Sequence, residues 1–284
     1  MGTGERGLKR LIVTGDDFGL AVPVNEAIES AHRDGILTAA CLMVGAPAAA
    51  DAVARAKRLP NLAVGLHVVL ARGRPVLPPE RVPDLVDEAG RFDDDLVRAG
   101  VRYFFLPRVR RQLEAEIHAQ FEAFRATGLP LDHVNAHNHL HVHPTILGAI
   151  LRVGREFGLN AVRVPFEPDA EGGLGPRFRA ALLRLWVVPM KSRLRRAGIA
   201  YNDYIFGLHD SGGMDRERMQ AVLSRLPEGA SEIFTHPATR RWEDMDSAAS
   251  DYRFEAEYAA LIDADVRAAV TRSGASLIAF RDLH

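Results

Sequence analysis

Two adjacent carboxylates lie near the amino terminus, in the segment Thr14-Gly15-Asp16-Asp17-Phe18-Gly19. Neighbouring side chains point in different directions, so one carboxylate can bind a metal ion while the other faces a substrate. An Asp pair beside glycine is also common as a helix cap or a turn. The pair by itself is therefore weak evidence for a site.

The strongest signal is the histidine-rich segment DHVNAHNHLHVHP, residues 132–144. Strand alternation puts His133, Asn135 and His137 on one face. Beyond the strand end, three further histidines are expected to line the loop: His139, His141 and His143. Two neutral imidazoles and one carboxylate hold a divalent ion and leave positions open for water and substrate. The alternative is an incidental surface cluster that binds metal adventitiously.

Three more polar side chains lie in or directly after apolar runs that read as strands. His67 closes VGLH, His236 lies in FTHPA, and Arg163 lies in AVRV. An imidazole with a pKa near ~6.5 can protonate a leaving amine, which would suit His236. The planar guanidinium of Arg163 can orient a carboxylate. Each of the three, taken alone, is as readily explained as a structural residue.

The elements that must position these residues alternate between strand and helix. Apolar runs predict strands, and the intervening segments, many beginning with proline, predict amphipathic helices. The strands are expected at Leu11–Val13 before a turn at Gly15–Gly19, and at Ile36–Val44, Leu62–Val69, Leu131–His137, Ala161–Val164, Ser231–Thr235 and Leu277–Phe280. One long helix is expected at about Phe254–Ser273.

This alternation predicts a parallel sheet covered by helices. We expect a single α/β domain over residues 1–284, built as a (β/α) barrel that is distorted or incomplete. Ligands of such folds bind at the carboxyl ends of the strands. The candidate residues all fall at those ends: Asp16, Asp17, His67, His137 and His236.

Composition excludes several other classes of protein. The 284 residues carry 36 basic and 37 acidic side chains, so no basic footprint for nucleic acid is present. The chain lacks the nucleophile-elbow, phosphate-loop and dinucleotide-binding glycine motifs. Cys41 is its only cysteine and reads as a buried thiol. Without a signal-like apolar run, the protein is expected in the cytoplasm, in contact with the membrane at most peripherally.

Residues 172–202 contain seven basic side chains and no acid, mixed with large apolar ones such as Trp186 and Val188. This composition is typical of an interfacial helix, which predicts peripheral membrane contact through residues 174–196. Pro189 is expected to divide the segment into two pieces. Tyr103-Phe104-Phe105 is expected to join the apolar rim. The alternative is a core helix with a solvated arginine face.

Taken in order, the motifs TGDDFGL, VGLHVVL, HVNAHNHLHVHP and THPA resemble the YdjC/ChbG family of carbohydrate deacetylases. The resemblance runs from about Leu11 to Phe280. It implies a deacetylase-type (β/α) barrel and one divalent ion. Family members often carry DSHHHVH where this chain has NAHNHLH, so Asn138 replaces the middle histidine.

The resemblance also implies roles for individual residues. Asp17, His67 and His137 would be the metal ligands. Asp16 would be the general base that activates water, and His236 the general acid or oxyanion partner. Arg163 would orient Asp16. The ligand types suit zinc, whereas the family is usually discussed with magnesium, so the sequence leaves Mg²⁺ and Zn²⁺ both open.

The basic segment, together with TGDD and HNHLH, is similar to the hopanoid-biosynthesis subgroup of the family (HpnK type). That similarity implies removal of the acetyl group from an N-acetylglucosaminyl hopanoid. Two alternatives stay open: a deacetylase of soluble N-acetyl-oligosaccharides, and a non-catalytic protein that binds sugar or metal on the same scaffold. A metal enzyme for another bond, such as a lactam or phosphoester, and a homodimer are also left open.

Overall fold

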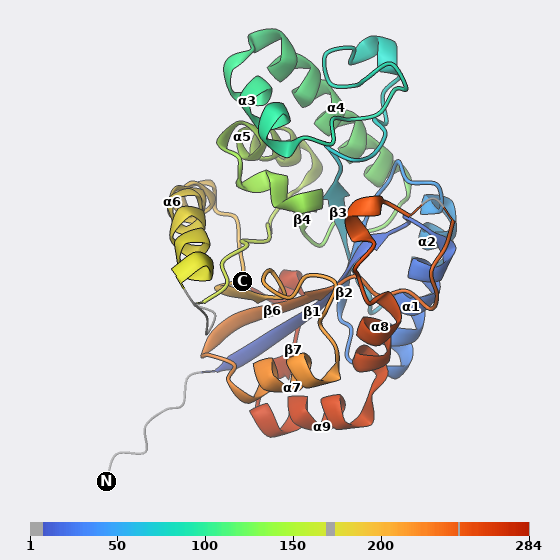
Figure 1. Cartoon of the computed structure of the whole chain (residues 1–284), viewed down its shortest axis with the longest axis vertical. Coiled ribbons are helices and arrows are strands. Elements are labelled where there is room, and N and C mark those ends of the chain that lie inside the picture. Colours follow the sequence, from blue (N-terminus) through green and yellow to red (C-terminus); the bar gives the residue numbers. More distant parts are fainter. Residues whose placement is uncertain (1–7, 169–173, 244, 284) are drawn as a thin grey trace.

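The computed structural model describes residues 8–168, 174–243 and 245–283, and its strands form one curled parallel sheet (Figure 1). The strand order is β4-β3-β2-β1-β6-β5, and β7 pairs with β1. Every described strand pair is parallel. This confirms the predicted distorted barrel. The strands are β1 Lys9–Phe18, β2 Ala39–Leu42, β3 Ala63–Val68, β4 Val134–Ala136, β5 Tyr204–Phe206, β6 Gly229–Thr235 and β7 Ser276–Leu277.

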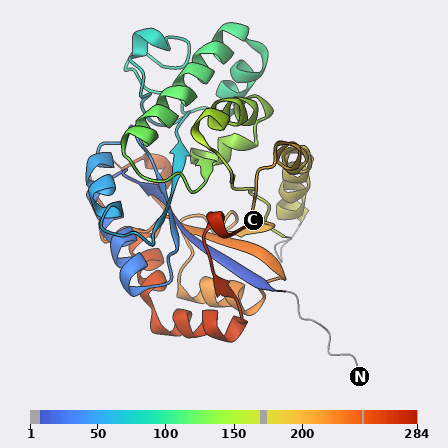
Figure 2. The ribbon, with the colours of Figure 1, turned by 180° about the vertical axis from the view of Figure 1, so that it is seen from behind.

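Helices lie around the outside of the sheet, as the views from the two sides show (Figures 1 and 2). Three of them, α1, α4 and α5, carry proline in the first turn. Proline is tolerated there because backbone N–H groups of the first turn have no acceptor within the helix. The helices are α1 Val22–Asp34, α2 Ala49–Ala56, α3 Leu96–Phe105, α4 Pro107–Ala126, α5 Pro144–Gly154, α6 Leu174–Ala197, α7 Arg216–Ser224, α8 Phe254–Ile262 and α9 Ala264–Ser273.

The first strand is longer than the sequence predicted. β1 continues to Phe18 instead of ending before a turn at Gly15–Gly19. Its pairing with β2 shifts register between Gly15 and Phe18, and Asp17 takes the left-handed conformation, with φ 61°. A bulge of this kind redirects side chains without ending the strand. The bulge turns Asp16 and Asp17 toward different partners.

The expected strand at Ala161–Val164 is reduced to two isolated bridges, Val134 with Val162 and Ala161 with Ala200. The side chain of Asn202 takes over the next positions of the ladder. Its Oδ1 accepts from the Val164 N–H at 2.7 Å, and its Nδ2 donates to the Val164 carbonyl at 2.9 Å. The barrel is therefore joined between β4 and β5 by an irregular seam.

Two predictions about the carboxyl-terminal segment are wrong. The long helix at 254–273 is two helices, because Asp263 is extended and its carboxylate accepts from the N–H groups of Asp265 and Val266. That contact caps a new helix. The final strand is only β7, and a short 3₁₀ turn at Phe280–Leu283 replaces the rest.

Two predictions about the apolar segments are also wrong. α6 is one continuous helix across Pro189, and Val187, Met190 and Leu194 anchor it to the core. Tyr103 is buried, and its hydroxyl donates to the Leu70 carbonyl at 2.8 Å, so it does not join an apolar rim. Within the described part of the chain, no helix combines the length and apolar composition needed to cross a membrane.

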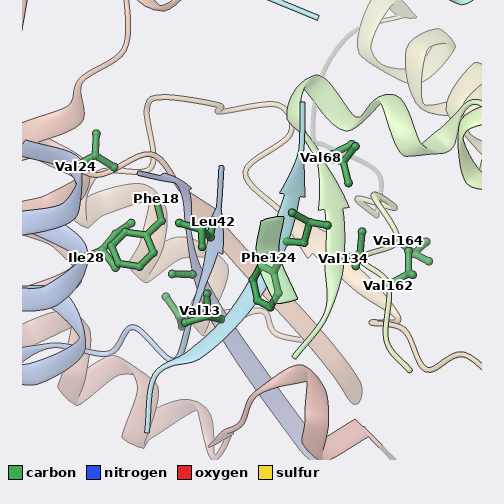
Figure 3. Packing of buried hydrophobic residues seen from close by; sticks show 14 of the residues in the cluster. Val13, Phe18, Val24, Ile28, Leu42, Val68, Phe124, Val134, Val162 and Val164 are labelled. Atoms are coloured by element: carbon green, nitrogen blue, oxygen red, sulfur yellow. The ribbon is translucent and has the colours of Figure 1, made fainter. Parts of the chain in front are cut away.

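Period-two alternation divides each strand between two environments. Val13, Leu42 and Val68 face the helices, where they pack with helix residues such as Ile28 and Phe124 (Figure 3). The intervening positions contact one another inside the curled sheet. There a separate small cluster contains Ile12, Ala39, Ala63, Ala161, Ala279 and Phe280.

Above this apolar cluster, the interior becomes polar. The ring of His133 stacks on Phe280 with centroids 4.1 Å apart, and its Nε2 lies 3.2 Å from the Cys41 sulfur. A Cβ added at Gly65 would lie only 2.5 Å from the His133 ring, so only glycine leaves room for it. This layer supports the polar side chains at the carboxyl ends of the strands.

Candidate active site

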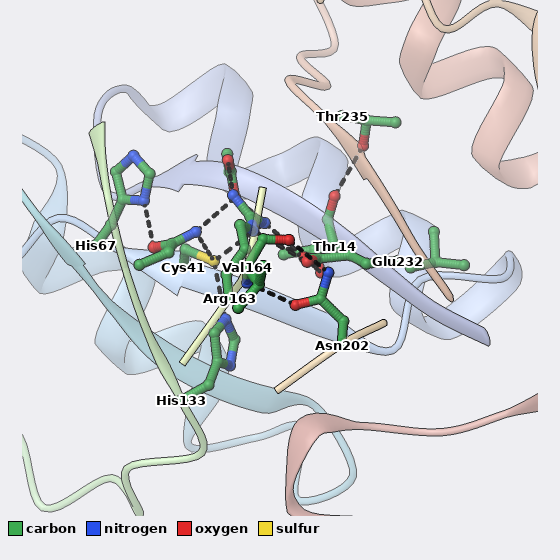
Figure 4. A network of polar contacts seen from close by, with 12 residues as sticks. Thr14, Cys41, His67, His133, Arg163, Val164, Asn202, Glu232 and Thr235 are labelled. Atoms are coloured by element: carbon green, nitrogen blue, oxygen red, sulfur yellow. Dashed lines mark hydrogen bonds and ion pairs between the residues drawn. The ribbon is translucent and has the colours of Figure 1, made fainter. Parts of the chain in front are cut away.

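Arg163 lies between two buried carboxylates at the centre of the barrel (Figure 4). Its two terminal nitrogens donate to the two oxygens of Asp16, at 2.6 and 2.9 Å. Its Nε and Nη2 donate to Glu232, and the Thr14 hydroxyl donates to the same Glu232 carboxylate at 2.7 Å. A guanidinium with five donors can satisfy both acids at once.

This pairing fixes the charge of both partners. Burial is the largest single effect and raises the pKa of Asp16, but the charge and hydrogen bonds of Arg163, together with the nearby His67 and His236, outweigh it and hold that pKa well below its usual range. Burial lowers the pKa of Arg163, whereas Asp16 and Glu232 raise it well above the ordinary value. Asp16 is therefore a carboxylate throughout the physiological pH range.

Asp17 faces the opposite way, toward His67 of β3 and His137, which directly follows β4. Its Oδ1 lies 3.4 Å from His67 Nε2 and 3.2 Å from His137 Nδ1. These two nitrogens lie 3.4 Å from each other. Burial is the largest single effect and lowers the pKa of His137, but the charge and hydrogen bond of Asp17, together with the charge of Asp16, outweigh it and raise that pKa.

The donor set of these three residues fits a divalent cation. One ligand atom from each of Asp17, His67 and His137 lies within 4.8 Å of the others. Two imidazoles and a carboxylate with free coordination positions match an open catalytic site. Asp16, Cys41 and His67 also cluster, but both Asp16 oxygens already accept from Arg163. Burial also raises the pKa of the Cys41 thiol, which disfavours the thiolate that would bind metal.

Asn135 pairs with His67 in the sheet and connects the two halves of the site. With its oxygen 2.7 Å from His67 Nδ1, that nitrogen carries the proton and Nε2 is free to bind a metal. With the amide turned round, its nitrogen donates to His67 and its oxygen accepts from Arg163 at 2.6 Å. A metal on His67 Nε2 requires the first orientation.

His236 follows β6 and lines the same cavity as the two aspartates. Its main-chain N–H donates to the buried Glu257 carboxylate at 2.6 Å, and Glu257 also accepts from the Met214 N–H at 2.8 Å. The His236 ring contacts Phe234 and Tyr252. Its Nδ1 is buried and has no hydrogen-bond partner among the described residues. The ring therefore has an unused polar atom beside the aspartates.

The remaining histidines of the segment have different environments. In His141, Nδ1 accepts from the Ala136 N–H and Nε2 donates to the Arg163 carbonyl, so both nitrogens are used in the fold. Burial lowers its pKa to about 3. His143 caps α5 by accepting from the Thr145 N–H. His139 is the one that lines the cavity; both it and Asn138 have φ 54°.

The cavity around these residues has a volume of about 1160 Å³. Its aspartates and histidines form one wall, whereas Met43, Val69, Trp242 and Met245 contribute an apolar part. Ligand cavities usually have volumes of about 300–1,000 Å³, so the space exceeds that of a single sugar ring.

Two side chains of α4, one carboxylate and one carboxamide, hold one edge of the cavity in place. Glu116 accepts from the N–H groups of Val76 and Leu77, at 2.8 and 3.0 Å. Gln120 binds both main-chain groups of Val69. Residues 69–77 are thus fixed to α4 by buried side chains.

The structure brings all five predicted rim residues to this cavity: Asp16, Asp17, His67, His137 and His236. Arg163 lies behind Asp16 and does not line the cavity. Sequence reasoning placed Asn135 on the face of His133 and His137 without giving it a role, and it missed Glu232, Glu257 and Glu116. For Glu232 a signal existed, because a charged residue inside the apolar strand Ser231–Thr235 needs a buried partner. Glu257 and Glu116 lie on amphipathic helices, where an acid usually faces solvent.

Residues 10–272 of this chain match the YdjC-like protein family. A carbohydrate deacetylase of Geobacillus stearothermophilus is 31% identical over 281 residues, covering 96% of this chain and 97% of that protein. One of Thermoanaerobacter pseudethanolicus is 27% identical, covering 91% and 93%. One of Brevibacillus brevis is 41% identical over 160 residues, and that match spans 55% of this chain and 60% of the relative's length.

Solved structures show the same architecture. A putative cellobiose-phosphate cleavage protein of Enterococcus faecalis superposes with a TM-score of 0.69 and 25% identity, over 97% of this chain and 99% of the other. An uncharacterized protein of Agrobacterium tumefaciens superposes with a TM-score of 0.51 and 12% identity, over 100% and 92%. The second likeness is one of fold alone.

Proposed function

Because the chain belongs to the YdjC-like family, we propose that it is a metal-dependent carbohydrate deacetylase, which hydrolyses the acetamide of an N-acetylated sugar. The observation that carries this proposal is that the two adjacent aspartates contact different partners. Asp17 lies with His67 and His137, whereas Asp16 is held by Arg163 on the other side of the bulge. One cavity therefore has a wall of residues suited to a metal ion and a separate carboxylate that is charged at neutral pH before reaction.

We assign Asp17, His67 and His137 as the residues that hold the divalent ion. A divalent ion there would polarise the acetamide carbonyl and acidify a water molecule. Mg²⁺ and Zn²⁺ are the two candidates. The nitrogen ligands of the site favour zinc on chemical grounds, whereas magnesium prefers oxygen.

The remaining roles follow from where the side chains lie. Asp16 takes the proton from the attacking water, and Arg163 keeps its carboxylate charged and oriented. Water oxygen bonds to the acetyl carbon, the C–N bond breaks, and acetate and a free amine are the products. His236 delivers the proton to the departing amine, which leaves as the amino sugar.

We further propose that the sugar is lipid-linked, as the N-acetylglucosaminyl group of a hopanoid is. The apolar part of the cavity, with Met43, Val69, Trp242 and Met245, supports a substrate larger and less polar than one sugar. A soluble N-acetyl-oligosaccharide is the second candidate, because the matched relatives are carbohydrate deacetylases.

The test is acetate release from N-acetylglucosaminyl bacteriohopanetetrol and, separately, from N-acetyl-chitooligosaccharides. Wild type is compared with Asp16→Asn, before and after chelation. Asp246→Asn serves as the control, because Asp246 also lines the cavity but lies outside the metal group. Loss of acetate with Asp16→Asn and with the chelator supports the mechanism. Release from oligosaccharides alone removes the lipid assignment, and no release from either substrate contradicts the deacetylase proposal.

A further inference from the structure

Exposed apolar side chains gather on one side of the molecule, away from the cavity. Of the eleven large hydrophobic residues that are exposed in the described part of the chain, five belong to α3 and its carboxyl-terminal cap and three to α6. Val97 and Leu185 are the most exposed members of the two groups, at 76% and 69%. Scattered single exposures are ordinary, but a concentration of this kind marks an interaction surface.

A row of ring contacts, two edge-to-face and one stacked, joins the two helices into one surface. Phe105 contacts Phe104, Phe104 contacts His143, and His143 stacks on Trp186, with ring centroids 4.9, 5.9 and 6.3 Å apart. We call this surface the aromatic face: Phe104, Phe105, His143, Leu185, Trp186 and Val188. In both views of the ribbon, α3, α5 and α6 follow one another along one side (Figures 1 and 2). His143, at the start of α5, is the link between them.

Three exposed or partly exposed arginines border the aromatic face. The Arg110 guanidinium lies 5.9 Å from the centre of the Phe104 ring. Arg193 donates to the Pro144 carbonyl, next to His143, at 2.7 Å. Arg196 follows one turn later on α6 and donates to Ser192. Within the described residues, none of these three arginines forms an ion pair with a carboxylate. No carboxylate among the described residues neutralises these three charges, which can therefore meet anions outside the protein.

We propose that the aromatic face binds the surface of an anionic phospholipid bilayer. Aromatic and aliphatic side chains enter the boundary between headgroups and acyl chains, where tryptophan is favoured. The bordering arginines meet lipid phosphates and the negative surface potential. A second copy of the chain is a poorer partner, because twofold contact between identical faces would bring arginines of like charge together.

This inference differs from what composition alone predicted. It adds α3 and His143 to the basic segment, and on α6 it uses only residues from Leu185 onward. The side chains of residues 169–184, which include Arg177, Arg179 and Arg184, lie outside those described. The inference does not depend on the proposed deacetylase activity, since no residue of the aromatic face lines the cavity.

Binding is measured by co-sedimentation of the full chain with vesicles of pure phosphatidylcholine and of phosphatidylcholine with phosphatidylglycerol. Wild type should bind the anionic vesicles and lose that binding in high salt. The double variant Phe105→Ser/Val188→Ser should bind at least about tenfold more weakly, because two exposed apolar side chains no longer enter the bilayer. Leu8→Ser is the matched apolar control, since Leu8 is 72% exposed but lies outside the face.

The electrostatic part is tested with Arg196→Glu, which should weaken binding to anionic vesicles. Arg272→Glu is its control, because both arginines occupy the last turn of a helix. The chain has two tryptophans, so Trp242→Phe leaves Trp186 as the fluorescent probe. Its emission should shift to the blue on addition of anionic vesicles and not on addition of neutral ones.

Three outcomes would overturn the proposal: no sedimentation of wild type with anionic vesicles, equal binding by wild type and Phe105→Ser/Val188→Ser, or an unshifted Trp186 spectrum. A wild-type dimer in light scattering that the double variant makes monomeric would assign the face to a second copy. Asp16→Asn should bind vesicles like wild type, so a failure of the deacetylase proposal is distinguishable from a failure of this one.

Discussion

Both carboxylate oxygens of Asp16 accept hydrogen bonds from Arg163, at 2.6 and 2.9 Å, in the interior of the barrel. The contact joins a strand at the amino terminus to the irregular seam between β4 and β5. A carboxylate so placed is held in one orientation and cannot rotate freely. The same contact therefore contributes to the stability of the barrel and holds the carboxylate of its proposed general base in orientation.

Replacing Arg163 by methionine should lower the free energy of unfolding by about 3–5 kcal/mol at pH 7.5, because Asp16 and Glu232 would remain buried without their counterion. Chemical denaturation measures this loss. Arg152→Met is the control, since its bidentate pair with Glu114 is exposed and should contribute less than about 1 kcal/mol. Equal losses in the two variants would contradict the prediction.

The same pair predicts opposite pH dependences for wild type and Arg163→Met. In wild type the folded pKa of Asp16 is depressed, so its stabilising contribution is present above the ordinary carboxyl pKa of about 3.9 and is lost on acidification below it. In Arg163→Met, burial without the guanidinium raises that pKa. The stability gap between the two proteins should therefore narrow as the pH falls toward 5.

Asp17→Asn should weaken binding of Zn²⁺ or Mg²⁺ at least about a hundredfold, because one of three proposed ligands loses its charge. Isothermal titration calorimetry of the metal-free protein measures the affinity for the metal ion in the absence of substrate. Asp246→Asn should bind metal as wild type does. Undiminished affinity in Asp17→Asn would place the ion elsewhere.

Glu116→Gln should destabilise the protein by about 1–3 kcal/mol, because one glutamine oxygen cannot replace two carboxylate oxygens that accept from Val76 and Leu77. The freed segment borders the cavity, so KM should rise more than kcat falls. Glu114→Gln, on the same helix but exposed to solvent, controls for the loss of charge. A change in kcat alone would argue against a role in fixing this edge.

Glu257→Gln should lower kcat, because the main chain of His236 would lose a charged acceptor at 2.6 Å and the ring would move. Denaturation and initial rates are measured on the same samples. Glu255→Gln, exposed to solvent two residues earlier on α8, should resemble wild type in both. If kcat is unchanged while stability falls, Glu257 has only a structural role.

The sequence predicted the curled parallel sheet and the cavity residues because both depend on local rules. Apolar runs alternate with helical periodicity, and polar residues follow the runs, so Asp17, His67 and His137 could be placed at one rim. These rules fail where a side chain forms the hydrogen bonds that backbone groups form in a regular strand or helix. Asn202 completes the ladder beside Val164, and Asp263 caps a second helix inside a continuous helical pattern.

The buried residues that support the cavity side chains were harder to predict from the sequence. Glu232 and Glu257 act across more than twenty residues of chain, through partners that only the fold brings together. Tyr103 was misplaced because an aromatic side chain in an irregular segment has no period to show which way it faces. The bulge at Asp17 was missed because its sequence, between two glycines, is equally compatible with a turn.

The rate at which Cys41 reacts with an alkylating reagent can report the opening of this barrel. This cysteine is the only thiol in the chain, is fully buried, and lies 3.2 Å from His133 and 3.9 Å from Arg163. A maleimide can reach it only when the strands around Asp16 separate, so the alkylation rate reports how often the interior opens. Ions or substrates that hold the rim together would slow the labelling, which makes one buried sulfur a reporter of binding events at the cavity.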